Sequence, residues 1–198
     1  MTHYARLCVA LPSLAAVVPP AWREAKLARD GDWPPAHVTL MNSAEVRDAL
    51  AGACQAPASA PFVRDGAGEP FLHPADARRQ LVSAVRRVRT GPLRVHGLGV
   101  AVGAAGAAAA FVVVDWPAGG AFRNWMGLPK ADFHITLGFD GEDPHDVRKN
   151  RGSLLRAPPG GWPRGEAGFA AMRAALVARV EGLRAAQRSN AAQPMQQD

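Results

Sequence analysis

Two short segments of the chain carry nearly the same pattern, and this duplication constrains the fold more than any other feature. The segments are His37-Val-Thr-Leu40 and His134-Ile-Thr-Leu137, each with β-branched residues and flanking turn residues, which is typical of a strand. Side chains alternate across a strand, so the His and Thr of each copy point to one face and the apolar pair to the other. Each copy therefore predicts a strand with a core face and a polar, working face.

The polar faces have the chemistry of a phosphoester site. Two such strands facing each other would offer the imidazoles of His37 and His134 to one ligand, one neutral as general base and the other protonated as general acid. The hydroxyls of Thr39 and Thr136 would donate hydrogen bonds to phosphate oxygens, and their β-branched rotamers would hold these donors in place. This logic requires no metal and no other cofactor.

The paired His-x-Thr-hydrophobic motifs, roughly a hundred residues apart, resemble those of the 2H phosphoesterase superfamily. The resemblance extends over about residues 1–150, and three further segments carry it: Ala110–Trp116, Arg123–Pro129 and Asp132–Phe139. It implies an α+β, bilobal fold in which two antiparallel sheets with pseudo-twofold symmetry line a central cleft, with helices outside. It also implies hydrolysis of 2′,3′-cyclic or 2′–5′ phosphodiesters without a metal, as in RNA end repair. Met41-Asn42 follows the first motif where Gly138-Phe139 follows the second, so the two halves are not equivalent.

Three alternatives stay open on the sequence alone. A strand histidine is often a satisfied core or surface residue. The chain could also be an RNA- or nucleotide-binding module that has kept the cleft and lost turnover. A zinc site on His37 and His134 is disfavoured, because no acidic or cysteine ligand stands at the usual spacing beside either residue.

Charge and composition narrow the partners. A formal net charge of +6 and a pI near 10.3 favour an anionic partner, here an RNA end or a small ribonucleotide substrate, although some basic proteins have no such role. Cys8 and Cys54 form neither a metal-binding spacing nor a disulfide framework, which favours a reducing, cytoplasmic compartment. No apolar run approaches the length of a membrane span. We therefore expect a cytoplasmic monomer with no membrane partner.

Several residues near the second motif are candidate substrate contacts. Arg123 and Lys130 could meet a phosphate, or be surface charges. Phe139 and the nearby Trp125 could stack on a base, or pack in the core. His145, in Asp143-Pro-His-Asp146, follows the motif and is a candidate contact at the mouth of the cleft.

Periodicity and turn residues predict the remaining elements. Strands are expected at 4–11, 36–42, 92–102, 109–116 and 132–138, and helices at 20–29, 44–54, 75–88, 119–127, 144–155 and 166–187. Ser43 is the expected N-cap of helix 44–54, with Glu45 in its first turn. The Gly/Ala segment Gly103–Gly106 predicts a hairpin turn, and residues 55–74 a loop or lid.

These elements predict the domain organisation. A 2H phosphoesterase-like domain covers 1–156, a C-terminal helical extension 157–188, and a disordered tail 189–198. Helix 166–187 has an apolar stripe for packing on the domain or on a partner. The arginines of helix 75–88 form either a solvated face or a contact to a phosphate backbone.

Overall fold

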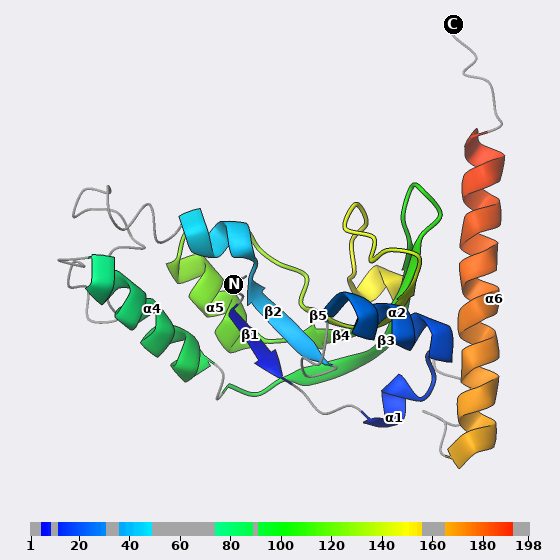
Figure 1. Ribbon diagram of the computed structural model, residues 1–198, viewed down its shortest axis with the longest axis horizontal. Coiled ribbons are helices and arrows are strands. Elements are labelled where there is room, and N and C mark those ends of the chain that lie inside the picture. The colour runs from blue at the N-terminus through cyan, green and yellow to red at the C-terminus, as the bar shows by residue number, and fades with distance from the viewer. Residues whose placement is uncertain are drawn as a thin grey trace, which may run out of the picture. The chain divides into compact units, whose positions relative to one another are not determined.

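The structure, a computed structural model, describes residues 5–8, 12–30, 36–48, 74–88, 91–155 and 165–191. Figure 1 shows its helices and strands in chain order. The chain divides into two compact units, each built from three segments. Unit 1 comprises Met1–Cys8, Val38–Arg94 and Val114–Phe133, and unit 2 comprises Val9–His37, Val95–Val113 and His134–Asp198.

A three-stranded sheet lies almost wholly in unit 2. Its strands are β3 (Arg94–Val102), β4 (Ala108–Asp115) and β5 (His134–Asp140), hydrogen-bonded in that order, and β5 runs antiparallel to β4. The turn between β3 and β4 closes where the Gly103 N–H donates to the Ala107 carbonyl at 2.8 Å. Gly106 has a φ of 81°, a left-handed conformation that glycine adopts without steric strain. The predicted hairpin is confirmed.

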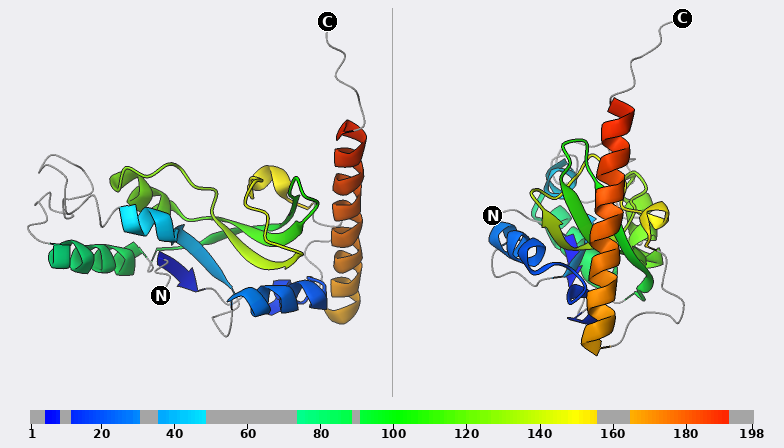
Figure 2. Two further views of the ribbon diagram at one scale, coloured as in Figure 1. Left: turned by 45° about the horizontal axis from the view of Figure 1, so that its top comes forward. Right: turned by 90° about the vertical axis from the view of Figure 1, so that its right-hand side faces the viewer.

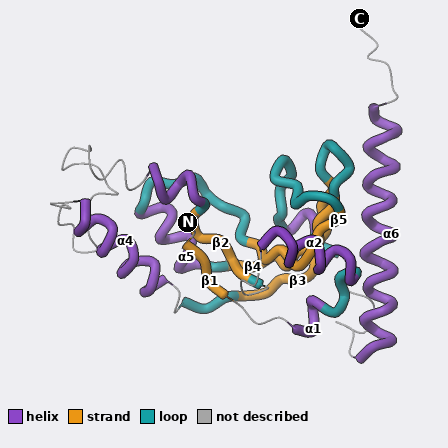
Figure 3. The backbone as a smooth tube through the Cα atoms, viewed as in Figure 1, coloured by secondary structure: helices purple, strands orange, loops and turns teal. Residues whose placement is uncertain are grey.

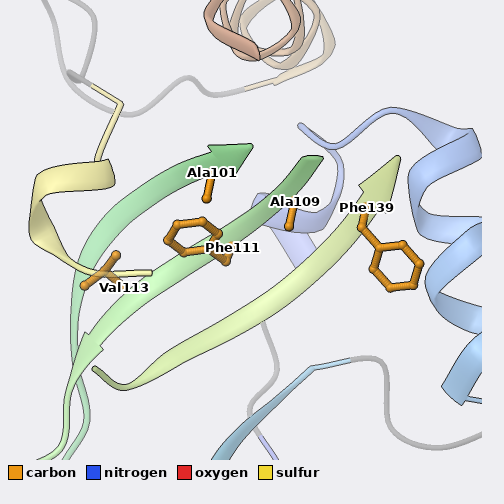
Figure 4. Close-up of a cluster of buried hydrophobic side chains, with 5 residues drawn as sticks. All are labelled: Ala101, Ala109, Phe111, Val113 and Phe139. Carbon is orange, nitrogen blue, oxygen red and sulfur yellow. The ribbon is translucent and has the colours of Figure 1, made fainter. Parts of the chain in front are cut away.

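Small and aromatic side chains of this sheet form the hydrophobic cluster in Figure 4: Ala101, Ala109, Phe111, Val113 and Phe139. Helix α2 (Pro20–Asp30) packs against β5 (Figure 3). The close approach depends on Gly138, since a Cβ at this position would lie 2.9 Å from the backbone carbonyl of Trp22. The glycine after the second motif is therefore a packing requirement of α2.

A continuous helix, α6 (Gly165–Ala191), is the last described element of the chain (Figure 2). Its buried residues recur every four positions, as the apolar stripe predicted: Met172, Leu176 and Val180. Arg173 donates to the Ala16 carbonyl at 2.7 Å, next to the short helix α1 (Pro12–Ala15). Packing of the helix on the protein itself is thus confirmed within unit 2. The helix also runs to Ala191, into the segment predicted as a disordered tail.

Unit 1 holds the first motif strand. In it β1 (Ala5–Cys8) is the hydrogen-bonded neighbour of β2 (His37–Met41), whose first residue is counted with unit 2. Helix α4 (Pro74–Val88) packs against α5 (Pro117–Trp125). Gly127 ends α5 with a φ of 68°, and the next N–H donates back to the Arg123 carbonyl, which caps the helix.

One predicted helix is wrong. Residues 144–155 contain only one helical turn, the 3₁₀ turn Arg151–Ser153, because contacts with segments far away in the sequence hold this segment on the sheet. Asp146 accepts a 2.8 Å hydrogen bond from the backbone of the β3–β4 turn, and the Leu155 N–H donates to the Leu98 carbonyl at 2.8 Å. In an α-helix the Leu155 N–H would instead bond the carbonyl four residues before it.

The α+β class is confirmed. The pseudo-twofold relation and the central cleft stay predictions. The predicted loop 55–74 lies outside the described residues except for Pro74, which begins α4.

Candidate active site

The first motif strand has the alternation predicted for it. Val38 and Leu40 of β2 are fully buried, whereas His37 and Thr39 are half-buried. The apolar pair is therefore the anchor of the strand, and the His and Thr keep access to solvent. The Nδ1 atom of His37 is itself buried, so the accessible part of this side chain lies elsewhere on the ring.

A capping box follows the first motif. The Asn42 side chain accepts a 2.9 Å hydrogen bond from the Glu45 N–H, and the Glu45 carboxylate accepts one of 2.9 Å from the Asn42 N–H. Residues 43–48 are helical, so Ser43 is the first residue of the helix and Asn42 is its cap. The prediction of Ser43 as N-cap is wrong by one position. Asn42 stands three residues before Glu45, which is the spacing that a capping box requires.

Arg123 of α5 joins this capping box to the motif strand. Its Nη1 and Nη2 donate to Glu45 at 3.0 and 2.7 Å, and Nη1 also donates to the Leu40 carbonyl at 2.7 Å. Its Nε donates to the Pro129 carbonyl at 2.9 Å. The residue is only 6% exposed. The guanidinium predicted to meet a phosphate is therefore engaged with protein acceptors on all three nitrogens, and it fixes the end of β2.

Electrostatics support this reading of the cluster. Burial by itself raises the pKa of Glu45, but hydrogen bonds from Arg123 and from the Asn42 backbone, with the Arg123 charge, outweigh it. The resulting pKa lies below the ordinary value of 4.5, so Glu45 is ionised at neutral pH. A charged, bidentate pair therefore holds the residues that follow Thr39.

The second motif strand repeats the exposure pattern of the first. In β5 Ile135 and Leu137 are buried, and His134 and Thr136 are half-buried. The register with β4 shifts directly after Thr136, because Phe111 pairs with Thr136 and the preceding Ala110 pairs with Gly138. Such a bulge bends a strand and re-aims its side chains, and bulges are frequent beside active sites.

The polar face of β5 is not purely a solvent-facing surface. Directly paired residues point to the same face, so Phe111 and Val113 share a face with Thr136 and His134. The Phe111 and His134 rings meet edge to face, with centroids 5.9 Å apart. The apolar pair of β5 is buried and the polar pair half-buried, as the two predicted faces imply. The polar face is nevertheless partly covered, because His134 borders the hydrophobic cluster of unit 2.

A buried ionic cluster lies beside the second motif threonine. The Thr136 hydroxyl is 3.4 Å from Asp143 Oδ2, which also accepts from Arg29 Nη1 at 3.2 Å. The buried Lys149 ammonium binds the other oxygen of Asp143. Burial by itself raises the pKa of Asp143, but the charge and hydrogen bond of Lys149 and then those of Arg29 lower it below 3.8. Asp143 is therefore a carboxylate at neutral pH.

Sequence reasoning missed Arg29, Asp143 and Lys149. Asp143 stands in the Asp-Pro-His-Asp segment, where only His145 attracted attention, and nothing around Arg29 or Lys149 resembles a site motif. Only the packing of α2 against β5 brings Arg29 to the motif strand.

The other predicted contacts fall in different environments. Phe139 is 3% exposed, packs in the cluster of unit 2, and has the Arg29 guanidinium 4.6 Å from its ring centroid. The Phe139 ring is therefore covered by protein and cannot stack on a base. Trp125 packs on Phe122 with ring centroids 5.8 Å apart. Lys130 and His145 are exposed and remain available to a ligand.

Two features are absent from the described residues. No helix there is long and apolar enough to cross a membrane. No three His, Cys, Asp or Glu side chains in the same part of the chain gather as metal ligands would.

Comparison with known proteins bears on the duplicated motifs. A family model described as 2H-SAK, Swiss Army Knife, 2H phosphoesterase domain, matches residues 2–145, a range that contains both motifs. No curated protein and no solved structure matches the chain. The model covers well over half of the sequence, in agreement with the resemblance carried by the two His-x-Thr strands. The chain therefore belongs to the 2H phosphoesterase family.

Proposed function

We propose that this phosphoesterase is a metal-independent phosphodiesterase that hydrolyses 2′,3′-cyclic phosphates or related ribonucleotide phosphodiester bonds. The observation that carries the proposal is the matched exposure of the two motif strands. Each presents a half-buried His and Thr above a buried apolar pair. The basic charge of the chain, +6 at neutral pH, supports an anionic substrate such as an RNA end or a small ribonucleotide.

In the proposed mechanism the two histidines act on one phosphate. One imidazole takes a proton from water as the water oxygen bonds to phosphorus, and the other gives a proton to the ribose oxygen as its bond to phosphorus breaks. The hydroxyls of Thr39 and Thr136 stabilise the charge that grows on the non-bridging oxygens. The exposed Lys130 and His145 are retained as proposed substrate contacts. RNA end repair is the proposed biological setting.

Substitution of each motif histidine tests this mechanism. Adenosine 2′,3′-cyclic phosphate would be the substrate, with excess chelator present throughout. We expect His37→Ala and His134→Ala to lower kcat by about 10²–10⁴-fold, because each removes a general acid or base. Thr39→Ala and Thr136→Ala should lower it less, since each removes one of several donors. The matched control is His96→Ala, because His96 is a half-buried strand histidine outside both motifs.

The outcomes separate the competing readings. Wild-type turnover by His37→Ala would refute the mechanism, and turnover abolished by chelator would favour a metal site. Nucleotide binding without any turnover would favour the non-catalytic binding module. A bell-shaped dependence of kcat/KM on pH is expected for an acid–base pair, whereas metal-bound hydroxide would give a rate that rises to a plateau.

The length of the bound nucleic acid needs a separate test. Arg86 and Arg87 of α4 are exposed and could bind an RNA backbone. If they do, the affinity for an RNA ending in a cyclic phosphate should fall steeply with added salt, and that for a mononucleotide only weakly. The double substitution Arg86→Gln and Arg87→Gln should flatten the RNA response. An unchanged slope would remove α4 from the substrate path.

A further inference from the structure

The ionic cluster beside Thr136 has one more positive charge than negative. Lys26 pairs with Asp30 at 2.6 Å, and Lys149 pairs with Asp143. Arg29 lies between the two pairs, 2.8 Å from Asp30 and 3.2 Å from Asp143. Each carboxylate thus already has a lysine of its own, and the charge of Arg29 is in excess among the described residues of this cluster.

Burial differs sharply within the cluster. The side chains of Lys26 and Lys149 are each 3% exposed, so these two cations are committed to their aspartates. The Arg29 side chain is 41% exposed. The excess charge is therefore on the one cation of the cluster that an anion from solvent can reach.

The guanidinium of Arg29 is held in a defined orientation. Its Nε donates to Asp30 at 2.8 Å, its Nη1 donates to Asp143 at 3.2 Å, and its Cζ lies over the Phe139 ring. No hydrogen bond joins its Nη2 to the part of the chain that the structure describes. A donor that is already oriented loses little conformational entropy when it binds a ligand.

The Arg29 guanidinium lies close to the motif hydroxyl. Asp143 Oδ2 is within 3.2 Å of Arg29 Nη1 and within 3.4 Å of Thr136 Oγ1, so the arginine and the hydroxyl are at most two hydrogen-bond lengths apart. The 3.4 Å contact of Thr136 is long and hence weak. A rotation of the hydroxyl would exchange the aspartate for a phosphate oxygen at little cost.

We propose that Arg29 is a substrate-binding residue that, together with Thr136, receives an oxygen of the substrate phosphate. The inference rests on the proposed function in placing Thr136 at the reacting phosphate. Asp143 and Asp30 are then positioning residues, which orient the arginine, and the two buried lysines keep these carboxylates from neutralising it. Arg29 then makes the phosphate contact that the sequence suggested for Arg123.

Substitution of Arg29 by glutamine tests the proposal. Each aspartate keeps its lysine in Arg29→Gln, so the fold should persist, as thermal unfolding would verify. The probes are inorganic phosphate and adenosine 3′-monophosphate, measured by calorimetry, and the KM for adenosine 2′,3′-cyclic phosphate. We expect binding weaker by about tenfold or more, as the loss of a hydrogen bond to a charged group implies. Arg29→Lys, which keeps the charge and loses the fork, should fall between glutamine and wild type.

Arg184→Gln is the matched control, because Arg184 also binds two carboxylates, Asp140 at 2.8 Å and Glu181 at 2.9 Å, but lies on α6. It should bind both probes within twofold of wild type. Unchanged binding and KM in Arg29→Gln, or equal losses in both variants, would overturn the proposal for Arg29. In that case, hydrolysis by the wild-type protein would still support the proposed function. Weaker phosphate binding by Arg29→Gln in a protein without turnover would support Arg29 and refute the proposed function. A wild-type protein that binds neither probe would overturn the inference.

Discussion

Glu45 offers the sharpest test of how the first motif strand is held. Its carboxylate accepts two hydrogen bonds from Arg123, of 2.7 and 3.0 Å, and one of 2.9 Å from the Asn42 backbone. Glu45→Ala would remove all three and leave the Arg123 side chain, which is 7% exposed, without its counter-charge. Glu45→Gln would remove the charge but keep one acceptor for the cap, since glutamine also completes a capping box.

The structure sets the expected magnitudes. Breaking a buried ion pair by removing one partner costs about 3–5 kcal/mol, and losing a cap about 1 kcal/mol. The Glu45 side chain is 20% exposed, so water relieves part of the loss and the lower end of the ion-pair range applies. We expect the free energy of unfolding to fall by about 4 kcal/mol for Glu45→Ala and by about 2 kcal/mol for Glu45→Gln.

Urea denaturation at several pH values is the assay. Because the pKa of folded Glu45 is below 4.5, its ionised form stabilises the protein above that pH, and this stabilisation is lost as the pH falls through the folded pKa. The difference between wild type and Glu45→Gln should therefore be full at pH 7 and shrink as the pH falls below about 4.5. Glu166→Gln, an exposed glutamate in the first turn of α6, is the control and should change stability by less than about 0.5 kcal/mol.

Two results would refute this reasoning. Equal losses for Glu45→Ala and Glu45→Gln that do not vary with pH would mean that the ionic charge is irrelevant. A loss below about 0.5 kcal/mol for Glu45→Ala would mean that Arg123 does not depend on Glu45.

Three further predictions concern unit 2. Gly138→Ala should lower the free energy of unfolding by about 2 kcal/mol, because its Cβ would lie 2.9 Å from the Trp22 backbone. The control is Gly120→Ala in α5, where a Cβ would meet nothing within 4 Å, and it should be neutral or stabilise the protein by up to about 1 kcal/mol. Equal effects in urea denaturation would contradict the packing account. Leu176→Ala should lower the free energy of unfolding by about 3 kcal/mol, because it leaves a cavity under α6. Val177→Ala, at an exposed position, should lower it by less than about 0.5 kcal/mol, and the opposite order in thermal unfolding would contradict the packing of α6. Burial by itself raises the pKa of Asp30, but hydrogen bonds and charges of Arg29 and Lys26 lower it to about 2. The stability that Asp30 contributes should therefore be present above about pH 4 and be lost as the pH falls toward 2. An Asp30→Asn variant whose deficit from wild type is the same at pH 6 and pH 2 would rule this out.

Local pattern in the sequence determined most of the elements and the burial of the apolar motif residues. The alternation of His and Thr with Val, Ile and Leu predicts which side chains of each strand are buried, and the buried apolar pairs of β2 and β5 agree with it. The spacing of Met172, Leu176 and Val180 likewise determined the buried stripe of α6. The same two motifs predicted the family, which the family model matching residues 2–145 confirms.

Tertiary structure decided how the remaining polar groups pair. Arg123 meets Glu45 from 78 positions away, and Arg29 meets Asp143 from 114 positions away, so no local pattern could reveal either partner. The same holds for residues 144–155, where Asp146 bonds to the β3–β4 turn 42 positions earlier and the predicted helix is absent. A charged side chain is bound where packing brings an acceptor within reach, and that depends on which segments meet. The sequence therefore located the motif histidines and threonines, whereas the packing of α2 and α5 determined which acceptors Arg29 and Arg123 bind.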